Sequence, residues 1–492
     1  MSGATVVIGA DADALVAAHY LARAGRRALV VDEREAPDAP ALEPGWIPPR
    51  VVRDLALERH GLVVHAPDPW AAAPLPDGGR LELARDLARS AASTARASRR
   101  AAHRRPQFCG RMARLARVLE LLYAGPPPDP LARAPGELAR MAGLAWRVRR
   151  LGRRAIEDLL RVLPMPAADL LDDWFESDEL KGLLGLGGVM HLAQGPRSGG
   201  TAFALLHGHV GSPPGVFRPP RSNLVEVLAR LPGIEVRRGA RVARITVRAR
   251  RAAGIVLATG EEIAADCVVS GIDPRRTLLE LVDPAWLDPE LVRAVRNVRA
   301  RGVVARATLL LDREPGFSAL TLAPSLDDLE RAHDDAKYGR VPQRPALEAH
   351  AVDEAADAAG RRRVDVHVQY APHALAEGAW DSARRAALGD QVVALLAAHL
   401  PGGAAAVVER SVRTPLDLEA ARGWPQGQMH HAELALDQAL WMRPVPALAQ
   451  YRTPIRALYL GGPATHPGGG IAGAAGANAA REIIRDARRG RL

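Results

Sequence analysis

The chain has 492 residues, a hydrophobic content of 48% and a formal net charge of +10 at pH 7. A chain of this length is too long to fold around one small hydrophobic core, so we expect two domains, or one large domain with an inserted lobe. Nearly all of the 66 basic residues are arginine, with only Lys181 and Lys337 as lysines, which is typical of a GC-rich coding bias and does not favour a nucleic-acid partner.

Residues 5–32 have the pattern of a βαβ unit. A short apolar run ends at Gly9, a run with helical periodicity follows, and a second β-branched run ends at Asp32. In a dinucleotide site the glycine permits a tight turn, the helix N-terminus faces the pyrophosphate, and the acid binds a ribose hydroxyl. The unit therefore predicts a Rossmann-like fold.

The glycine pattern of this unit is damaged. The motif G-x-G-x-x-G would place glycine at positions 9, 11 and 14, where the chain has Gly9, Asp11 and Ala14. Alanine is accepted at the third position, because that residue only has to let helix and strand approach closely. Asp11 puts a Cβ and a negative charge where the backbone should meet phosphate, at a cost of roughly 1 to 4 kcal/mol.

Two charged segments lie in the predicted helical part of the chain. Arginines are concentrated over 96–105, where we expect a solvated helical face, with contact to anionic lipid or a partner as the alternative. Acidic residues are concentrated over 172–179. We interpret them as helix caps and solvated charge, because no histidine lies three or four positions away among them to complete a metal site.

The second half of the chain has two β-rich parts. Three strands separated by turn signals are predicted over 233–274, and further strands over 302–312 and 364–370. A helix is predicted over 382–399.

A glycine-rich segment, residues 457–486, ends the chain. A strand over 458–460 runs into a turn, and a helix of small residues begins near Ile471. Backbone N–H groups of such a loop and helix start are suited to an anion or to the polar edge of a ring. Tight helix packing is the alternative role for these glycines.

Several sequence blocks carry a family resemblance. They are the N-terminal βαβ unit, D-x-W-F-E-S-D-E-L-K from 172, C-V-V-S-x-x-D-P from 267, H-A-E-L-x-L-D-Q-x-x-x-M-R-P from 431, and L-Y-L-x-G-x-x-T-H-P-G-G-G-I-x-G from 458. Together they resemble the phytoene desaturase-like branch of the flavin amine oxidase superfamily, the NAD(P)/FAD-dependent oxidoreductases. The similarity spans essentially the whole chain.

The resemblance implies an α/β flavoprotein of two domains. A discontinuous, Rossmann-like FAD domain of the glutathione-reductase type would comprise residues 1–75, 215–275 and 450–492. An α+β substrate domain with helices, residues 76–214 and 276–449, would cover an apolar tunnel.

The resemblance also places the cofactor. Gly9 and Ala10 fall on the pyrophosphate turn, Asp32 on the ribose acid and Val242 on the adenine strand. The flavin end falls on the C-terminal glycine segment, at Gly462, Gly470, Ile471 and Gly473. In this family the cofactor itself performs the difficult chemical step, so no catalytic residue and no metal site are predicted.

Three histidines lie in or near the flavin end of the sequence. His430, His431 and His466 either contact substrate or flavin, or make loop hydrogen bonds, which is the commoner role.

Departures from the family pattern concentrate on cofactor positions. Besides Asp11 and Ala14, Pro37-Asp38-Ala39-Pro40 replaces a Gly-Gly pair, and Pro219 and Pro220 stand in place of a glycine turn. Proline lacks the N–H donor that a phosphate-binding nest needs. We therefore hypothesise that the fold is retained while the FAD site is partly or wholly lost.

Two functions follow from these expectations. The first is an FAD-dependent oxidoreductase of desaturase, dehydrogenase or isomerase type, acting on a hydrophobic, isoprenoid-like substrate. The alternative is a flavin-free, non-catalytic relative that serves as a subunit or scaffold, in a homo-oligomer or with a paralogous partner.

The expected location is cytoplasmic, with possible peripheral membrane contact through 96–105. No apolar run of 18 residues and no signal peptide are found, and the isolated Cys109 and Cys267 form no disulfide framework.

Overall fold

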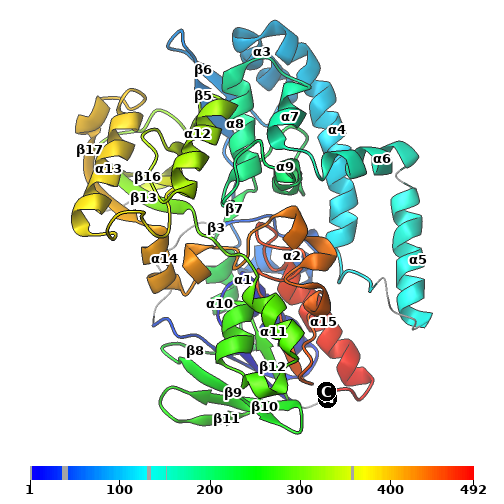
Figure 1. Ribbon diagram of the computed structural model, residues 1–492. Coiled ribbons are helices and arrows are strands. Elements are labelled where there is room, and N and C mark those ends of the chain that lie inside the picture. Colours follow the sequence, from blue (N-terminus) through cyan, green and yellow to red (C-terminus); the bar gives the residue numbers. More distant parts are fainter. Residues whose placement is uncertain (1–2, 36–42, 130–134, 151, 356–359) are drawn as a thin grey trace.

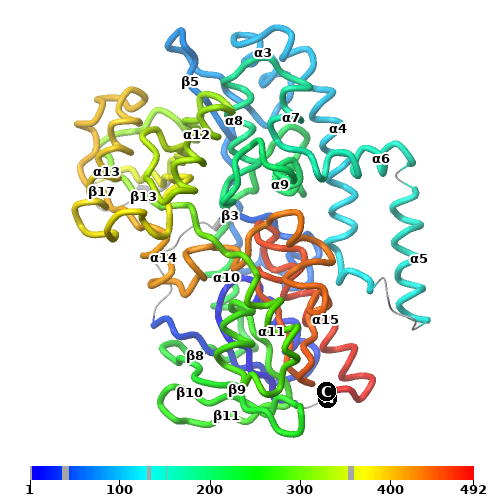
Figure 2. The backbone as a smooth tube through the Cα atoms, in the orientation of Figure 1, coloured from blue at the N-terminus to red at the C-terminus, as the bar shows by residue number. Residues whose placement is uncertain are grey.

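The computed structural model describes residues 3–35, 43–129, 135–150, 152–355 and 360–492. Figures 1 and 2 show a lower lobe built on a parallel sheet and an upper lobe that combines helices with an antiparallel sheet. The expected fold class, α/β with a Rossmann-like region and a second α+β part, is confirmed.

The parallel sheet has the strand order β18-β12-β1-β2-β8. Its strands come from distant parts of the chain: β1 (Ala4–Ile8), β2 (Arg27–Val31), β8 (Glu235–Arg237), β12 (Cys267–Ser270) and β18 (Leu458–Leu460). Both faces are covered, as is usual for parallel sheets.

Side chains of β1 alternate between the two faces of this sheet. Val7 packs in a core with helices on one face: α1 (Ala12–Arg23), α10 (Leu224–Arg230) and α15 (Ala474–Arg488). Val6 and Ile8 pack in a core on the other face with β9 (Val242–Arg248), β10 (Arg251–Leu257), β11 (Glu262–Ala264) and α11 (Pro289–Arg296).

The antiparallel sheet of the upper lobe has the order β14-β15-β16-β13-β17. Its strands are β13 (Val304–Leu311), β14 (Ala319–Leu322), β15 (Ala346–Ala355), β16 (Arg362–Gln369) and β17 (Val407–Arg413). One face carries Leu309, Leu347 and Val366, which share a core with α13 (Ser382–Ala397). The opposite face is polar and turns toward the interior of the molecule.

Helices make up the rest of the upper lobe, and a core with Phe108 and Phe203 lies between them. They are α3 (Leu87–Ala97), α4 (Arg99–Tyr123), α5 (Pro135–Arg149), α6 (Arg153–Val162), α7 (Ala167–Asp172), α8 (Asp178–Val189), α9 (Thr201–His209) and α12 (Leu326–Lys337). Shorter elements are α2 (Pro49–Asp54), α14 (Pro415–Arg422), the hairpin β5 (Ala71–Pro74) and β6 (Arg80–Leu83), and the small sheet of β3 (Glu43–Pro44), β7 (Arg221–Ser222) and β4 (Val64–His65).

The arginine-rich segment 96–105 is not a simple solvated face. Ser98 divides it between α3 and α4, and Arg105 is fully buried, with one guanidinium N–H donating to the Gly215 carbonyl. The exposed Arg100 lies 3.9 Å from the Glu176 carboxylate. The basic and acidic segments thus meet, and the residue that caps α8 is Ser177, with Asp178 and Glu179 in the first turn.

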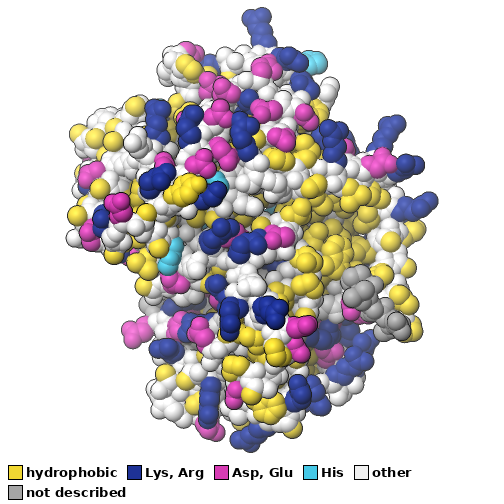
Figure 3. All heavy atoms as spheres, in the orientation of Figure 1, with side chains coloured by type: hydrophobic (Ala, Val, Ile, Leu, Met, Phe, Trp, Pro, Cys, Tyr) yellow, Lys and Arg dark blue, Asp and Glu magenta, His cyan; other side chains and the backbone are white. Residues whose placement is uncertain are grey.

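Figure 3 shows hydrophobic side chains gathered on the surface between α4 and α5. None of the side chains of α5 is buried, and Leu138 and Trp146 are among the most exposed apolar residues. Among the described residues, none of the helices combines the length and the apolar content that a membrane span requires.

Candidate functional site

A groove begins at the carboxyl ends of β1 and β2. Gly9 follows β1 with φ +92°, a conformation that side-chain-bearing residues rarely adopt, and its N–H donates to the Val31 carbonyl at 2.8 Å. Helix α1 starts three residues later. Its N-cap residue, Asp11, makes no side-chain capping bond, so the first-turn N–H groups keep the capacity to bind an anion.

Asp11 does not present an uncompensated charge to this groove. An Arg34 guanidinium nitrogen lies 3.0 Å from the Asp11 carboxylate and also 3.0 Å from that of Asp32, which Arg238 approaches at 3.4 Å. Burial opposes ionisation of Asp11, but Arg34 holds its pKa below the ordinary value. The negative charge of Asp11 therefore has a counter-charge that was not predicted from the sequence.

The groove has a volume of about 510 Å³. Of the predicted cofactor residues, Ala10, Gly470 and Ile471 line it. Gly9, Asp32 and Val242 line a cavity of only about 30 Å³ beside it, together with Arg34. The large space therefore lies at the α1 and glycine-loop end, and Arg34 borders both spaces.

Gly462 and Gly473 line neither space. A Cβ at Gly462 would collide with the Gly271 carbonyl, and one at Gly473, where φ is +77°, would lie 2.9 Å from a methyl group of Val16. Both glycines therefore permit close packing of the chain behind the groove.

Of the proline departures, Pro219 and Pro220 do not line the groove. Pro219 and Pro220 line a different cavity, described below, and the Pro220 carbonyl accepts a hydrogen bond from the Gly45 N–H at 2.9 Å. The segment from Pro37 to Pro40 lies outside the described residues. The groove thus combines an uncapped helix start, a glycine loop and the cations Arg34 and Arg238, and these residues fit a flavin dinucleotide.

A second, mostly apolar cavity of about 330 Å³ adjoins the groove. Its apolar wall includes Trp46, Trp70, Met190, Leu192 and Phe217. Residues that line both spaces are Pro44, His430, Gly469 and Gly470. A molecule in the cavity and a ring bound in the groove would meet along this shared wall.

The polar end of the cavity comes from the upper sheet. Glu348 of β15 pairs in register with His367 of β16, and His350 lies two residues along β15 on the same face. All three side chains are buried and line the cavity. These residues were not predicted from the sequence, although the alternation V-D-V-H-V-Q over 364–369 indicates a strand with one polar face.

The polar end is held in a defined charge state. Arg218 donates to the Glu348 carboxylate at 2.5 Å and, against the effect of burial, holds the pKa of Glu348 well below its ordinary value. Burial lowers the pKa of His367 and His430 well below the ordinary value and that of His191 to about 3. These imidazoles are therefore neutral at physiological pH.

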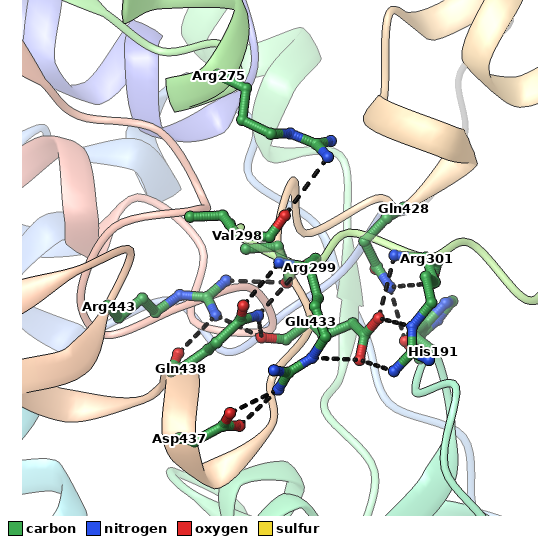
Figure 4. A network of polar contacts seen from close by, with 11 residues as sticks. His191, Arg275, Val298, Arg299, Arg301, Gln428, Glu433, Asp437, Gln438 and Arg443 are labelled. Atoms are coloured by element: carbon green, nitrogen blue, oxygen red, sulfur yellow. Dashed lines mark hydrogen bonds and ion pairs between the residues drawn. The ribbon is translucent and has the colours of Figure 1, made fainter. Parts of the chain in front are cut away.

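The backbone around His191 is held from both sides. Its φ is +63°, its N–H donates to the Gln369 side chain at 3.0 Å, and its carbonyl accepts from the Gln428 side chain at 2.7 Å (Figure 4). Left-handed conformations of non-glycine residues are costly and cluster at functional sites.

The loop that carries His430 is held by Arg443, which is completely buried. Its guanidinium donates to the His430 carbonyl at 3.2 Å. It also donates to the Glu433 carbonyl at 2.9 Å (Figure 4). Burial lowers the pKa of Arg443 to about 10, so it remains cationic. The block H-A-E-L-x-L-D-Q-x-x-x-M-R-P is thus a structural support for the cavity wall.

The three predicted histidines therefore differ in position. His430 lines both spaces. His431 is buried with a ring nitrogen 3.8 Å from the Asp11 carboxylate, at the small cavity. His466 lines neither space, and its ring bonds to the Leu122 carbonyl at 3.0 Å, which is the loop role.

Comparisons with known proteins agree with this arrangement. Residues 167–484 match the family described as flavin containing amine oxidoreductase. The chain is 31% identical to the pyridine nucleotide-disulfide oxidoreductase domain-containing protein 2 of Rattus norvegicus, over 98% of this chain and 93% of the relative. It is 25% identical to a subunit of the limonene dehydrogenase of Castellaniella defragrans, over 98% and 94%.

Solved structures share the fold. The wild-type putrescine oxidase bound to putrescine superposes with a TM-score of 0.59 at 14% identity, covering 99% of each chain. The family match covers well over half of the chain, and the groove fits the family's cofactor. The chain therefore belongs to the flavin-containing amine oxidoreductase family, as an FAD-dependent member of the amine oxidase superfamily.

Proposed function

We propose that this protein is an FAD-dependent oxidoreductase that acts, as phytoene desaturases do, on a hydrophobic, isoprenoid-like substrate. The observation that carries the proposal is the shared wall at His430, Gly469 and Gly470, which joins the groove at the start of α1 to a mostly apolar cavity. The relative from Castellaniella defragrans, whose name refers to the terpene limonene, supports the same substrate class.

Different residues of the groove would bind different parts of the cofactor. The N-terminus of α1 with Arg34 and Arg238 would hold the diphosphate, and Asp32 the ribose. The loop at Gly470 and Ile471 would meet the flavin end. FAD, when bound, supplies the capacity to accept a hydride.

The substrate side excludes water and orients the substrate. The tryptophan, methionine and phenylalanine side chains of the apolar wall desolvate the bound molecule. The volume of about 330 Å³ lies at the low end of the range for small-molecule pockets, about 300 to 1,000 Å³, which favours a compact substrate over a long polyene.

An absorbance spectrum of the purified full-length protein tests the cofactor. We expect the two bands of oxidised flavin, as isolated or after incubation with FAD and removal of the excess. Bleaching of these bands by limonene without oxygen would then show electron transfer. A spectrum without flavin bands in both samples would contradict the proposal.

A subunit or scaffold role is the second candidate, and the exposed face of α5 favours it. Leu138 and Trp146 are about half exposed on a helix that has no buried side chain. Contiguous exposed apolar surface often marks a protein interface. Light scattering after size-exclusion chromatography distinguishes the candidates: a colourless protein that associates only through α5, and dissociates on Trp146→Glu, supports the subunit role.

A further inference from the structure

The polar end of the apolar cavity contains three imidazoles without a hydrogen-bond partner for their rings among the described residues. His367 is buried, and His191 and His430 are partly buried. The ring of His191 lies 5.3 Å, centroid to centroid, from that of His430 and 5.7 Å from that of His367. All three line the cavity. A ligand that fills the cavity and displaces its water must satisfy these nitrogens, because unpartnered polar groups are costly away from water.

The carboxylate at this end is already paired. Glu348 accepts from Arg218 at 2.5 Å and lies 3.7 Å from a ring nitrogen of His350. Arg218 also donates to the carbonyls of Phe217 at 3.0 Å and Leu183 at 3.3 Å. A protonated amine would need an uncompensated carboxylate here, whereas two cations, Arg218 and Arg221, line this cavity.

A metal ion is not favoured at this position either. Within the described part of the chain, the group that brings three possible ligand atoms within 4.8 Å of one another is Glu330, His333 and Asp334 on α12, which do not line the cavity. These three described histidines form a row with His191 in the middle, and their ring nitrogens do not all lie within 4.8 Å of one another.

We propose that an imidazole of this row binds the oxygen atom of a ketone or hydroxyl group on an otherwise apolar, compact substrate. His191, His367 and His430 are then specificity-determining residues, which donate to or accept from the oxygen while the apolar wall holds the hydrocarbon skeleton. The inference rests on the proposed function, because it names the substrate class of the same cavity. The proposed substrate class differs from the amine substrates that the names of some structurally similar proteins indicate.

Titration calorimetry of the full-length protein with three ligands of one skeleton tests the proposal. Limonene is the hydrocarbon, carvone adds a ketone, and carvylamine places an amine at the corresponding carbon. We expect carvone to bind about fivefold more tightly than limonene for each hydrogen bond formed, and carvylamine to bind most weakly. Equal binding of carvone and limonene, no binding of either, or tightest binding of carvylamine would overturn the proposal.

Variants assign the effect to the row. His367→Phe keeps a ring but removes its nitrogens, and it should abolish the preference for carvone while leaving limonene affinity within about twofold. His367→Gln restores one donor and one acceptor and should recover part of the preference. His399→Phe, at a histidine that lies outside the cavity, is the matched control. An unchanged preference in His367→Phe would refute the role of this residue.

Flavin absorbance of the same samples keeps the two proposals separate. A carvone preference in a protein that takes up no FAD would refute the oxidoreductase function and support the binding site. Normal flavin bands without a carvone preference would refute the binding site alone.

Discussion

Replacing Asp11 by glycine is expected to strengthen FAD binding. A carboxylate about 4 Å from a phosphate repels it by roughly 1 to 4 kcal/mol, depending on the local dielectric. The lower half of this range applies, because Arg34 lies 3.0 Å from the Asp11 carboxylate and already neutralises part of its charge. We expect a gain of about 1 to 2 kcal/mol, which is roughly five- to thirtyfold in Kd.

Quenching of FAD fluorescence on titration with the full-length protein measures this Kd. Asp11→Asn removes the charge and keeps the Cβ, so it should give most of the gain if charge is the obstacle. Asp77→Asn, at an exposed acid of the β5–β6 turn, should leave the Kd unchanged. Equal or weaker binding by both Asp11 variants would refute the reasoning and would show that the ion pair with Arg34 is needed to position the cation.

Three further predictions concern stability and reactivity. Burial raises the pKa of Asp13 from 3.8 to about 7, so the folded chain retains a proton that the unfolded chain releases. The contribution of Asp13 to the free energy of unfolding therefore falls as pH rises from about 4 to about 7. Urea denaturation of Asp13→Asn should lack this fall. Cys109 and Cys267 are buried thiols with raised pKa values. A thiol reagent should therefore modify neither cysteine in the native protein and both in urea. Modification of either thiol in the native protein would contradict its burial. Glu433→Gln should lower the free energy of unfolding by about 2 kcal/mol, because the wholly buried carboxylate pairs with Arg299 and Arg301. Asp437→Asn, at an exposed acid, is the control and should change the free energy of unfolding by under about 0.5 kcal/mol.

The N-terminal unit was predictable because its signals are local. A tight turn at Gly9, a helix after it and an acid at the end of β2 all follow from residues adjacent in the chain, although α1 starts at Ala12, before the periodic run at 15–24. The antiparallel strands around 304–311 and 362–369 were predicted for the same reason.

The charge balance of the groove was not predictable in this way. Whether Arg34 turns toward Asp11 depends on packing between segments that are 23 positions apart in the sequence. The polar end of the cavity required still more, because sheet order places Glu348 opposite His367, and a separate loop brings His191 beside them. Periodicity identifies the strands but not which strands become neighbours.

The two-sided character of β15 and β16 has a consequence for how this protein tolerates change. Leu347 and Val366 hold the lobe together, while Glu348 and His367, one position further along, face the cavity. Point substitutions on the cavity face can alter ligand preference and leave the apolar layer intact. Deleting a single residue within either strand would instead exchange the two faces, removing site and core together. We therefore expect descendants of this scaffold to diverge at this sheet by substitution, with insertions and deletions confined to the connecting loops.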